Sequence, residues 1–306
     1  MDALYEILSP NYIFRDALLA SLCIGFVCPL VGVYFVLRRM VFLGVALPQV
    51  SAAGIAFTFF AYASLAGPHD IEPASERILG GAGSIAFTVA VLLVLAYFER
   101  RRESVEARIG TIYALAAAAT MLFLAVDPHG DAQMVALLKG DMLATTSASL
   151  GFLAIALGLV AFAAFAFGKE LLLVSFDRDL AVVFGKRVGL WDLLLHVLIG
   201  VVISLGVMTA GPMTTFGFLI VPPVTVKLVA RSMLAFSLGS AILGAVTAFA
   251  GFYCACEFNV PLGPAEVGVA GIVLLLTGAG VGVRRIARAF GRRRASKSAV
   301  LDAGGV

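Results

Sequence analysis

The stretch LRRMVFLGVALPQVSAAG (residues 37–54) decides the fold, because one apolar run ends there on two arginines and a second begins within a few residues. A charged pair does not lie at the centre of a bilayer, so Arg38 and Arg39 place a turn at an aqueous face. The residues after the turn are unusually polar and irregular for a helix that faces lipid: Gly44, Pro48, Gln49, Ser51 and Gly54. Such a segment is typical of the inside of a helix bundle, where it can line a path.

The composition predicts a protein with several membrane spans. Of the 306 residues, 61% are hydrophobic and 13% are charged, and the mean hydropathy is +1.03. A soluble domain would need more charge on its surface. Uncharged runs of about 20 residues, the length that crosses a bilayer, recur along the chain. We therefore predict an all-α polytopic membrane protein with about nine spans, or eight, in one transmembrane domain over residues 1–290.

The apolar run over residues 193–226 is too long for one span. It contains the pairs Gly211-Pro212 and Pro222-Pro223, and proline removes a backbone hydrogen bond from a helix. We expect one span to about Ala210, then a break, and then a second span.

The positions of Lys and Arg predict the orientation. If the turn at Arg38 is cytoplasmic, the same side receives 19 of the 22 basic residues, and the opposite side receives Arg15, Arg77 and Lys139. The N-terminus is then outside and the C-terminus cytoplasmic. The tail over residues 291–306 is basic, and we expect it to be disordered beyond an anchor on anionic headgroups. Nucleic-acid binding is not expected there, because Phe290 is the single aromatic residue of the basic run.

The connector over residues 169–187 is short and amphipathic. Phe176, Leu180 and Phe184 repeat at i, i+4 spacing, which places them on one face of a helix. Such a helix can dock into the groove of a partner protein or rest on lipid headgroups, and its own sequence leaves both interpretations open. The chain has no Walker A pattern and no glycine-rich dinucleotide loop, so we expect no nucleotide site of its own.

The three histidines are the metal-ligand candidates that the residue types alone suggest. His69 and His129 stand beside acidic residues in two outer loops, where they form either a weak divalent-cation site or solvated turns. His196 lies one helical turn from Asp192, and we expect a charge-assisted pair between their side chains near the cytoplasmic interface. The alternative is that His196 is an exit ligand for an ion.

Four segments in register resemble the membrane subunits of bacterial zinc and manganese uptake systems, the metal-ion permeases of the ATP-binding-cassette superfamily. They are residues 37–54, 176–185, 211–230 and 260–266, and the resemblance extends over about residues 16–285. It implies a permease subunit in the bacterial plasma membrane that dimerises around a path for a divalent metal ion, zinc first and manganese second. The implied partners are a cytoplasmic ATPase and an extracytoplasmic metal-binding protein, and no cofactor is expected on this chain.

The resemblance also implies roles for residues. The ATPase-coupling residues would be Phe176, Asp177, Asp179, Ala181 and Gly185. The translocation path would be lined by Gly44, Pro48, Gln49, Ser51, Gly54, Gly211, Pro212, Pro222 and Pro223. The family commonly has an Asp and a His as intramembrane ligands where this chain has Val45 and Gln49. Valine cannot ligate, and an amide oxygen is a harder ligand than imidazole, so the metal ligands stay unassigned.

Two other classes of function make different demands. A secondary transporter for a small ion or solute would need intramembrane carboxylates or paired charges as relays, and apart from Asp192 and His196 the predicted spans hold almost none. An intramembrane enzyme would need a catalytic motif such as H-E-x-x-H or G-x-S-x-G, and the sequence contains neither.

Overall fold

The computed structural model describes residues 14–66, 73–98, 105–126, 142 and 145–303, and within these ranges the regular structure is entirely helical. The helices are α2 (Arg15–Leu37), α3 (Leu43–Ala66), α4 (Pro73–Phe98), α5 (Val105–Val126), α7 (Ser147–Ala166), α8 (Gly168–Phe176), α9 (Arg178–Val183), α10 (Val188–Lys227), α11 (Met233–Phe258) and α12 (Leu262–Ala303). The prediction of an all-α protein is confirmed.

The lengths and compositions of the helices fit a protein that crosses a membrane several times. Seven of the described helices are long and apolar enough to do so, and α4 contributes a shorter apolar stretch, Leu79–Leu95. The turn expected at the paired arginines is present, since α2 ends at Leu37 and Arg39 adopts a left-handed conformation with φ of 57° before α3 begins. The prediction that the N-terminus lies outside remains a prediction.

Helix α10 is a hairpin of two helical arms rather than one straight rod. Gly211 has φ of 82° and ψ of 164°, a conformation that residues with a Cβ rarely adopt. A Cβ added to Gly206 would lie 2.8 Å from Cγ2 of Thr215, so residues on either side of the turn face each other. Asp192 in the first arm and Lys227 at the end of the second both bond to the C-terminal end of α2. The expected break after Ala210 is confirmed.

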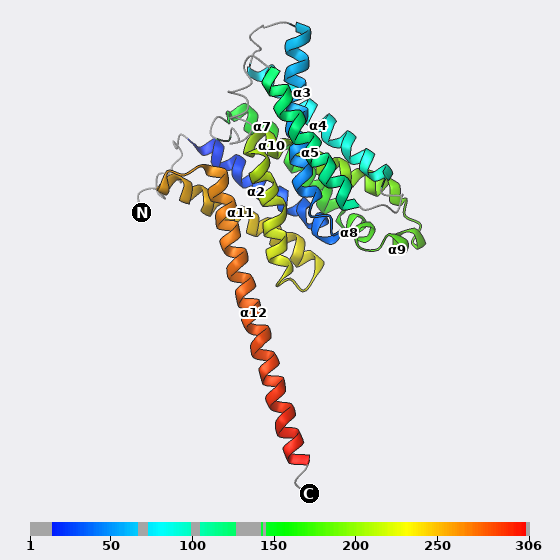
Figure 1. Cartoon of the computed structure of the whole chain (residues 1–306), viewed down its shortest axis with the longest axis vertical. Coiled ribbons are helices and arrows are strands. Elements are labelled where there is room, and N and C mark those ends of the chain that lie inside the picture. The colour runs from blue at the N-terminus through cyan, green and yellow to red at the C-terminus, as the bar shows by residue number, and fades with distance from the viewer. Residues whose placement is uncertain (1–13, 67–72, 99–104, 127–141, 143–144, 304–306) are drawn as a thin grey trace.

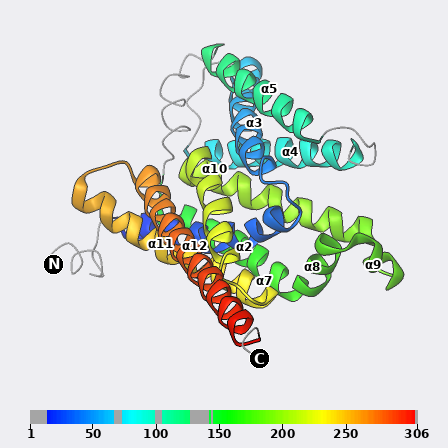
Figure 2. The same ribbon diagram turned by 60° about the horizontal axis from the view of Figure 1, so that its bottom comes forward.

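The hairpin lies between two groups of helices (Figures 1 and 2). Helices α4 and α5 both pack on α3, and α2 packs on α11, which packs on α12. Contact between α2 and α3 is slight, so α10, which packs against both groups, joins them. The interior at this junction is filled by large apolar side chains such as Phe35, Leu47, Leu195, Ile203 and Phe218.

Glycines allow the helices to approach closely within each group. A Cβ on Gly25 of α2 would lie 2.9 Å from the carbonyl oxygen of Gly244 on α11, and a Cβ on Gly83 of α4 would lie 2.9 Å from that of Gly54 on α3. In a membrane, such contacts drive helix association through van der Waals packing, because burying apolar surface gains little there.

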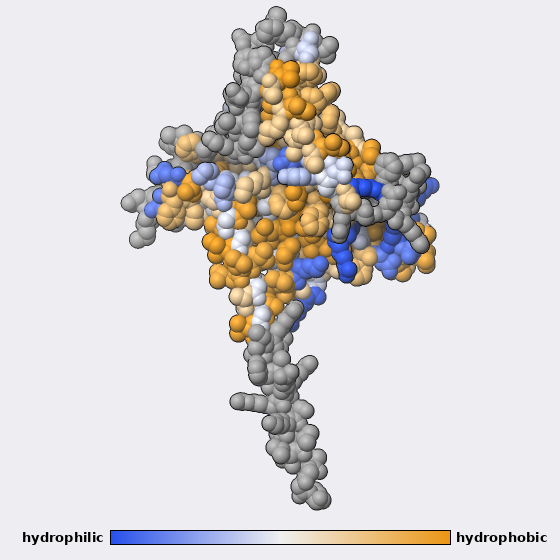
Figure 3. Space-filling model, viewed as in Figure 1, coloured by the Kyte–Doolittle hydropathy of each residue, from blue (hydrophilic) through white to orange (hydrophobic). Residues whose placement is uncertain are grey.

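Apolar residues cover most of the face seen in Figure 3, and hydrophilic residues gather around α8 and α9 and, in a smaller group, on the opposite side of this face. Helix α12 projects from the bundle and is helical to Ala303. Residues 291–303 continue α12, and they lack Pro and contain a single Gly at the start, a composition compatible with a helix. The disorder and the headgroup anchor expected for residues 291–306 remain predictions.

Candidate functional site

The connector between α7 and α10 forms two short helices with a sharp corner between them. Asp177 has an extended backbone, ends α8 and caps α9, and its carboxylate accepts a hydrogen bond from the amide of Leu180 at 2.9 Å. Gly185, with φ of 70°, ends the element in a left-handed conformation. The expected helix over residues 176–185 is therefore present in its central part, as Arg178–Val183.

One face of α9 is anchored and its tip is exposed. Ala181 is fully buried and packs with Val174 and Val188. Four apolar side chains at the corner and tip are 61–81% exposed: Phe176, Val182, Val183 and Phe184. Such a cluster on a charged connector offers a partner protein an apolar contact surface.

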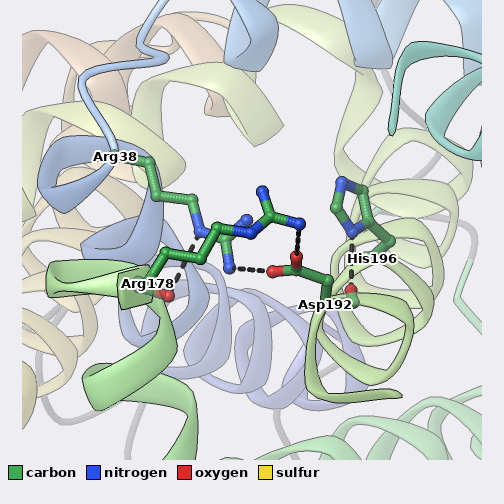
Figure 4. Close-up of polar contacts among 5 residues, drawn as sticks. Arg38, Arg178, Asp192 and His196 are labelled. Atoms are coloured by element: carbon green, nitrogen blue, oxygen red, sulfur yellow. Dashed lines mark hydrogen bonds and ion pairs between the residues drawn. The ribbon is translucent and has the colours of Figure 1, made fainter. Parts of the chain in front are cut away.

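A cluster of charges ties α9 to the ends of two long helices (Figure 4). Arg38 at the end of α2 donates from Nη2 to Oδ1 of Asp192 at 2.7 Å, and its Nε donates to the hydroxyl of Ser175 at 3.2 Å. Arg178 of α9 reaches the other oxygen of Asp192 at 2.8 Å. Asp192 thus holds α2, α9 and α10 together, and we name Arg38, Asp192 and Arg178 the inner charge cluster.

The two ion pairs of this cluster differ in burial. The side chains of Arg38 and Asp192 are 12% and 13% exposed, whereas that of Arg178 is 50% exposed. A half-exposed ion pair is screened by water and contributes little to stability. For a pair as buried as that of Arg38 and Asp192, loss of one partner leaves an uncompensated charge, which is strongly unfavourable.

The expected side-chain pair between His196 and Asp192 is wrong. Both carboxylate oxygens of Asp192 are used by the two arginines, and Nδ1 of His196 lies 2.6 Å from the backbone carbonyl oxygen of Asp192 (Figure 4). A carbonyl can only accept, so Nδ1 donates. The sequence spacing correctly put the two residues on one helical face, but it carried no information on the arginines that compete for the carboxylate.

The predicted path residues of α3 fall into two sets. Gly44 lies against the second arm of α10, where a Cβ would be 3.1 Å from Ile220 and 3.3 Å from Leu219. Ser51 and Gly54 face α4 instead: Ser51 is fully buried, and its hydroxyl lies 2.6 Å from that of Ser84. Their role in a translocation path remains a prediction, and within this chain they serve the α3–α4 contact.

The remaining path candidates lie at the start of α3 and along α10. Pro48 is buried, and Val45 and Gln49 are half-buried one turn apart. The α10 candidates are all buried: Gly211, Pro212, Pro222 and Pro223. Because Gly44 touches residues 219 and 220, the structure brings the beginning of α3 next to the Pro222-Pro223 end of α10.

Metal-ligand candidates are sparse in the part of the chain that the structure describes. There, no three His, Cys, Asp or Glu side chains gather as they would around a bound metal ion. The outer-loop candidates His69 and His129, with their acidic neighbours, lie outside the described residues.

Two polar contacts were missed by the sequence reasoning. Asp192 was considered only with His196, although charged residues that end neighbouring spans are natural partners at the same aqueous face. Glu266 was read only as the end of a family motif. The structure buries it completely inside an apolar span, with a hydrogen bond from Ser21.

Comparisons with known proteins agree with this arrangement. A manganese import system permease protein, ScaB, of Streptococcus gordonii is 25% identical over 271 residues, which cover 87% of this chain and 90% of the relative. A probable metal transport system membrane protein of Thermotoga maritima is 26% identical over 261 residues, covering 85% and 87% of the two chains.

A solved structure has the same fold. It is described as PsaBC from Streptococcus pneumoniae in complex with Fab, and it matches with a TM-score of 0.76 and 22% identity over 90% of this chain and 94% of that one. The sequence pattern of the ABC 3 transport family matches residues 11–279. The chain therefore belongs to the ABC 3 transport family.

Proposed function

We propose that the chain is the permease of an importer for a divalent transition-metal ion, with manganese favoured over zinc. Family membership makes it a multi-pass protein of the bacterial inner membrane and a transport subunit rather than an enzyme. It also sets aside the gradient-driven secondary transporter as its main activity, because this family works in ATP-driven systems.

The order of the two metals reverses the one expected from the sequence. Relatives from Streptococcus and Listeria are named for manganese, whereas one from Haemophilus influenzae is named for iron. The chemistry of Gln49 supports the reversal, because amide and carbonyl oxygens suit Mn²⁺ better than Zn²⁺. With Val45 unable to ligate, we infer that the path gives the ion only weak, transient coordination and that selection rests largely on a separate binding protein.

The observation that carries the proposal is the exposed apolar tip of α9 together with its anchorage. Phe184 and Val183 are exposed for a cytoplasmic partner, and Arg178 links the same helix to Asp192 and, through it, to α2. A displacement of α9 by a partner would thus be transmitted through Asp192 to α2 and α10. A partner ATPase, an extracytoplasmic metal-binding protein and a second copy of this chain complete the proposed transporter.

The coupling role of α9 is tested by Phe184→Ser, which removes an exposed ring and leaves buried Ala181 in place. Phe258→Ser is the matched control, because Phe258 is 70% exposed at the end of α11 and Phe184 is 65% exposed. If Phe184 is a central contact, copurification of the ATPase and ATP-driven manganese uptake fall by about tenfold or more. The control stays near wild type. Equal behaviour of the two variants contradicts the assignment of α9.

The path role of α3 is tested separately by Gln49→Ala and by the double variant Val45→Asp with Gln49→His. We expect slower uptake from Gln49→Ala, and a shift of preference towards zinc from the double variant, because imidazole suits zinc. The measurement is competition between manganese and zinc for uptake into proteoliposomes that hold the complete transporter. If neither variant changes rate or preference, the start of α3 is not the path, and the α10 segment around Gly211 becomes the candidate.

A further inference from the structure

A carboxylic acid lies where α2, α11 and α12 meet. Glu266 is on the second turn of α12, is fully buried, and belongs to a span without any other Asp, Glu, Lys or Arg from Leu262 to Val283. Gly251 of α11 faces it, and a Cβ at position 251 would collide with the backbone of Glu266. The glycine therefore makes room for the acidic residue between the helices.

The two oxygens of this carboxyl group are treated differently. The hydroxyl of Ser21 on α2 hydrogen-bonds to Oε1 of Glu266. Oε2 is buried and has no hydrogen-bond partner among the residues that the structure describes. One hydroxyl is a small compensation for an ionised carboxylate, which in water would accept several hydrogen bonds.

No counter-charge compensates the group either. The ionisable side chains of the helices around it are Arg15, Asp16, Cys23, Cys28 and Tyr34 on α2, and Tyr253, Cys254, Cys256 and Glu257 on α11. Arg15, the first residue of α2, is the single cation among them, and within the described residues none of these side chains bonds to Glu266. The second arm of α10, which also packs on α12, has no ionisable residue before Lys227 at its far end. The helix dipole acts within the first turn, and Glu266 is the fifth residue of α12.

An uncompensated carboxylate in such surroundings is too unfavourable to persist, so it must bind a positive charge. A hard metal cation takes six or more oxygen ligands, whereas Glu266 and Ser21 supply three oxygens between them. A proton needs one oxygen and no extra space. We propose that Glu266 is a proton-binding site, occupied at neutral pH, and that the neutral acid with Ser21 holds α2, α11 and α12 together.

The site lies beside the contacts between α12 and the α10 hairpin, so its protonation state can affect the hairpin. Gly263, about one turn before Glu266, packs against Thr214. Val267, which directly follows Glu266, packs against Gly217. Both contacts fall just beyond the turn at Gly211. Loss of the proton would place a charge beside the helix contacts that fix the second arm of α10.

The direct test is infrared spectroscopy of the full-length protein in lipid. We expect a carboxylic-acid C=O stretching band at neutral pH that is lost in Glu266→Gln, because the amide keeps the shape and removes the acid. The band persists in Glu257→Gln, which changes an exposed glutamate at the end of α11. A wild-type spectrum without a neutral carboxyl band, or a band that Glu266→Gln leaves intact, overturns the proposal.

A second measurement guards against an effect of folding alone. The folded protein holds one proton more than the unfolded chain, so its thermal stability falls as pH rises from mildly acidic to mildly alkaline values. We expect Glu266→Gln to flatten that dependence relative to Glu257→Gln. Replacing choline by sodium at constant pH should change neither the band nor the stability. A sodium-dependent stabilisation that requires Glu266 would show that the site binds a metal cation instead of a proton, and it would overturn the proposal. These readouts do not depend on which ion is transported.

Discussion

Two carboxylates contact α2 in opposite electrostatic surroundings. Asp192 meets its C-terminal end and is held by Arg38 and Arg178, whereas Glu266 contacts its N-terminal half through the hydroxyl of Ser21. The first is compensated by more than one positive charge, and the second by none in the described surroundings. The inner charge cluster is therefore sensitive to the loss of a charge, while the contact around Glu266 is sensitive to the gain of one and, at Gly251, to a change in volume.

The largest effect should come from Asp192→Ala. It removes the acceptor of both arginines and leaves the nearly buried Arg38 unpaired, which costs about 3–5 kcal/mol for a buried pair. Denaturant unfolding in lipid–detergent micelles measures this cost, and uptake by the whole transporter should be lost with it. The control is Glu257→Ala, since Glu257 is exposed. A cost below about 1 kcal/mol would show that the cluster behaves like a surface ion pair.

An intermediate effect is expected where volume alone is changed. Gly251→Ala adds a methyl group against the backbone of Glu266 without altering any charge, and such overpacking costs about 1–3 kcal/mol. Gly268→Ala on α12 is the matched control, because a Cβ there meets nothing within 4 Å. The control should be neutral or more stable by up to about 1 kcal/mol, as for alanine in place of glycine in a helix. An equal loss of stability in both variants would show that the contact around Glu266 is not specifically sensitive to volume.

The smallest change in stability should follow Arg178→Ala. Its side chain is half exposed, so its pair with Asp192 contributes about 1 kcal/mol or less to the free energy of unfolding. Uptake per ATP hydrolysed should nevertheless fall, because this arginine links α9 to Asp192. The comparison is with Asp192→Ala in the same two assays. If Arg178→Ala destabilises the protein as much as Asp192→Ala does, the three charges act as one structural unit and not as a separable link.

The features that the sequence predicted are those encoded by neighbouring residues. Helical class follows from apolar runs, the turn after α2 from Arg38 and Arg39, and the break in α10 from Gly211-Pro212. Contacts between distant residues were not predictable in this way. Arg38 and Asp192 are 154 positions apart, and Ser21 and Glu266 are 245 apart. Periodicity says which face of a helix is buried, but it does not say which helix covers that face.

The candidate path shows the same limit at single residues. Gly54 was expected to allow close approach of another backbone, and it does so, but the backbone is that of Gly83 in α4. Ser51 of α3 needed a polar partner away from lipid, and that partner is Ser84, also in α4. The physical requirement was correctly inferred from each residue type, whereas the partner that meets it depends on the tertiary structure.

The turn at Gly211 also sets the parity of membrane crossings. A straight helix of 40 residues would be about 60 Å long, twice the thickness of about 30 Å that a bilayer's hydrocarbon core presents. If α10 crossed once, the seven long apolar helices and α4 would give an even number of crossings, and both ends of the described chain would emerge on one face. The returning arm makes the number odd, so we expect α2 to start and α12 to end on opposite faces. One glycine conformation thereby bears on whether the basic residues after Val283 emerge on the face where α2 starts or on the opposite one.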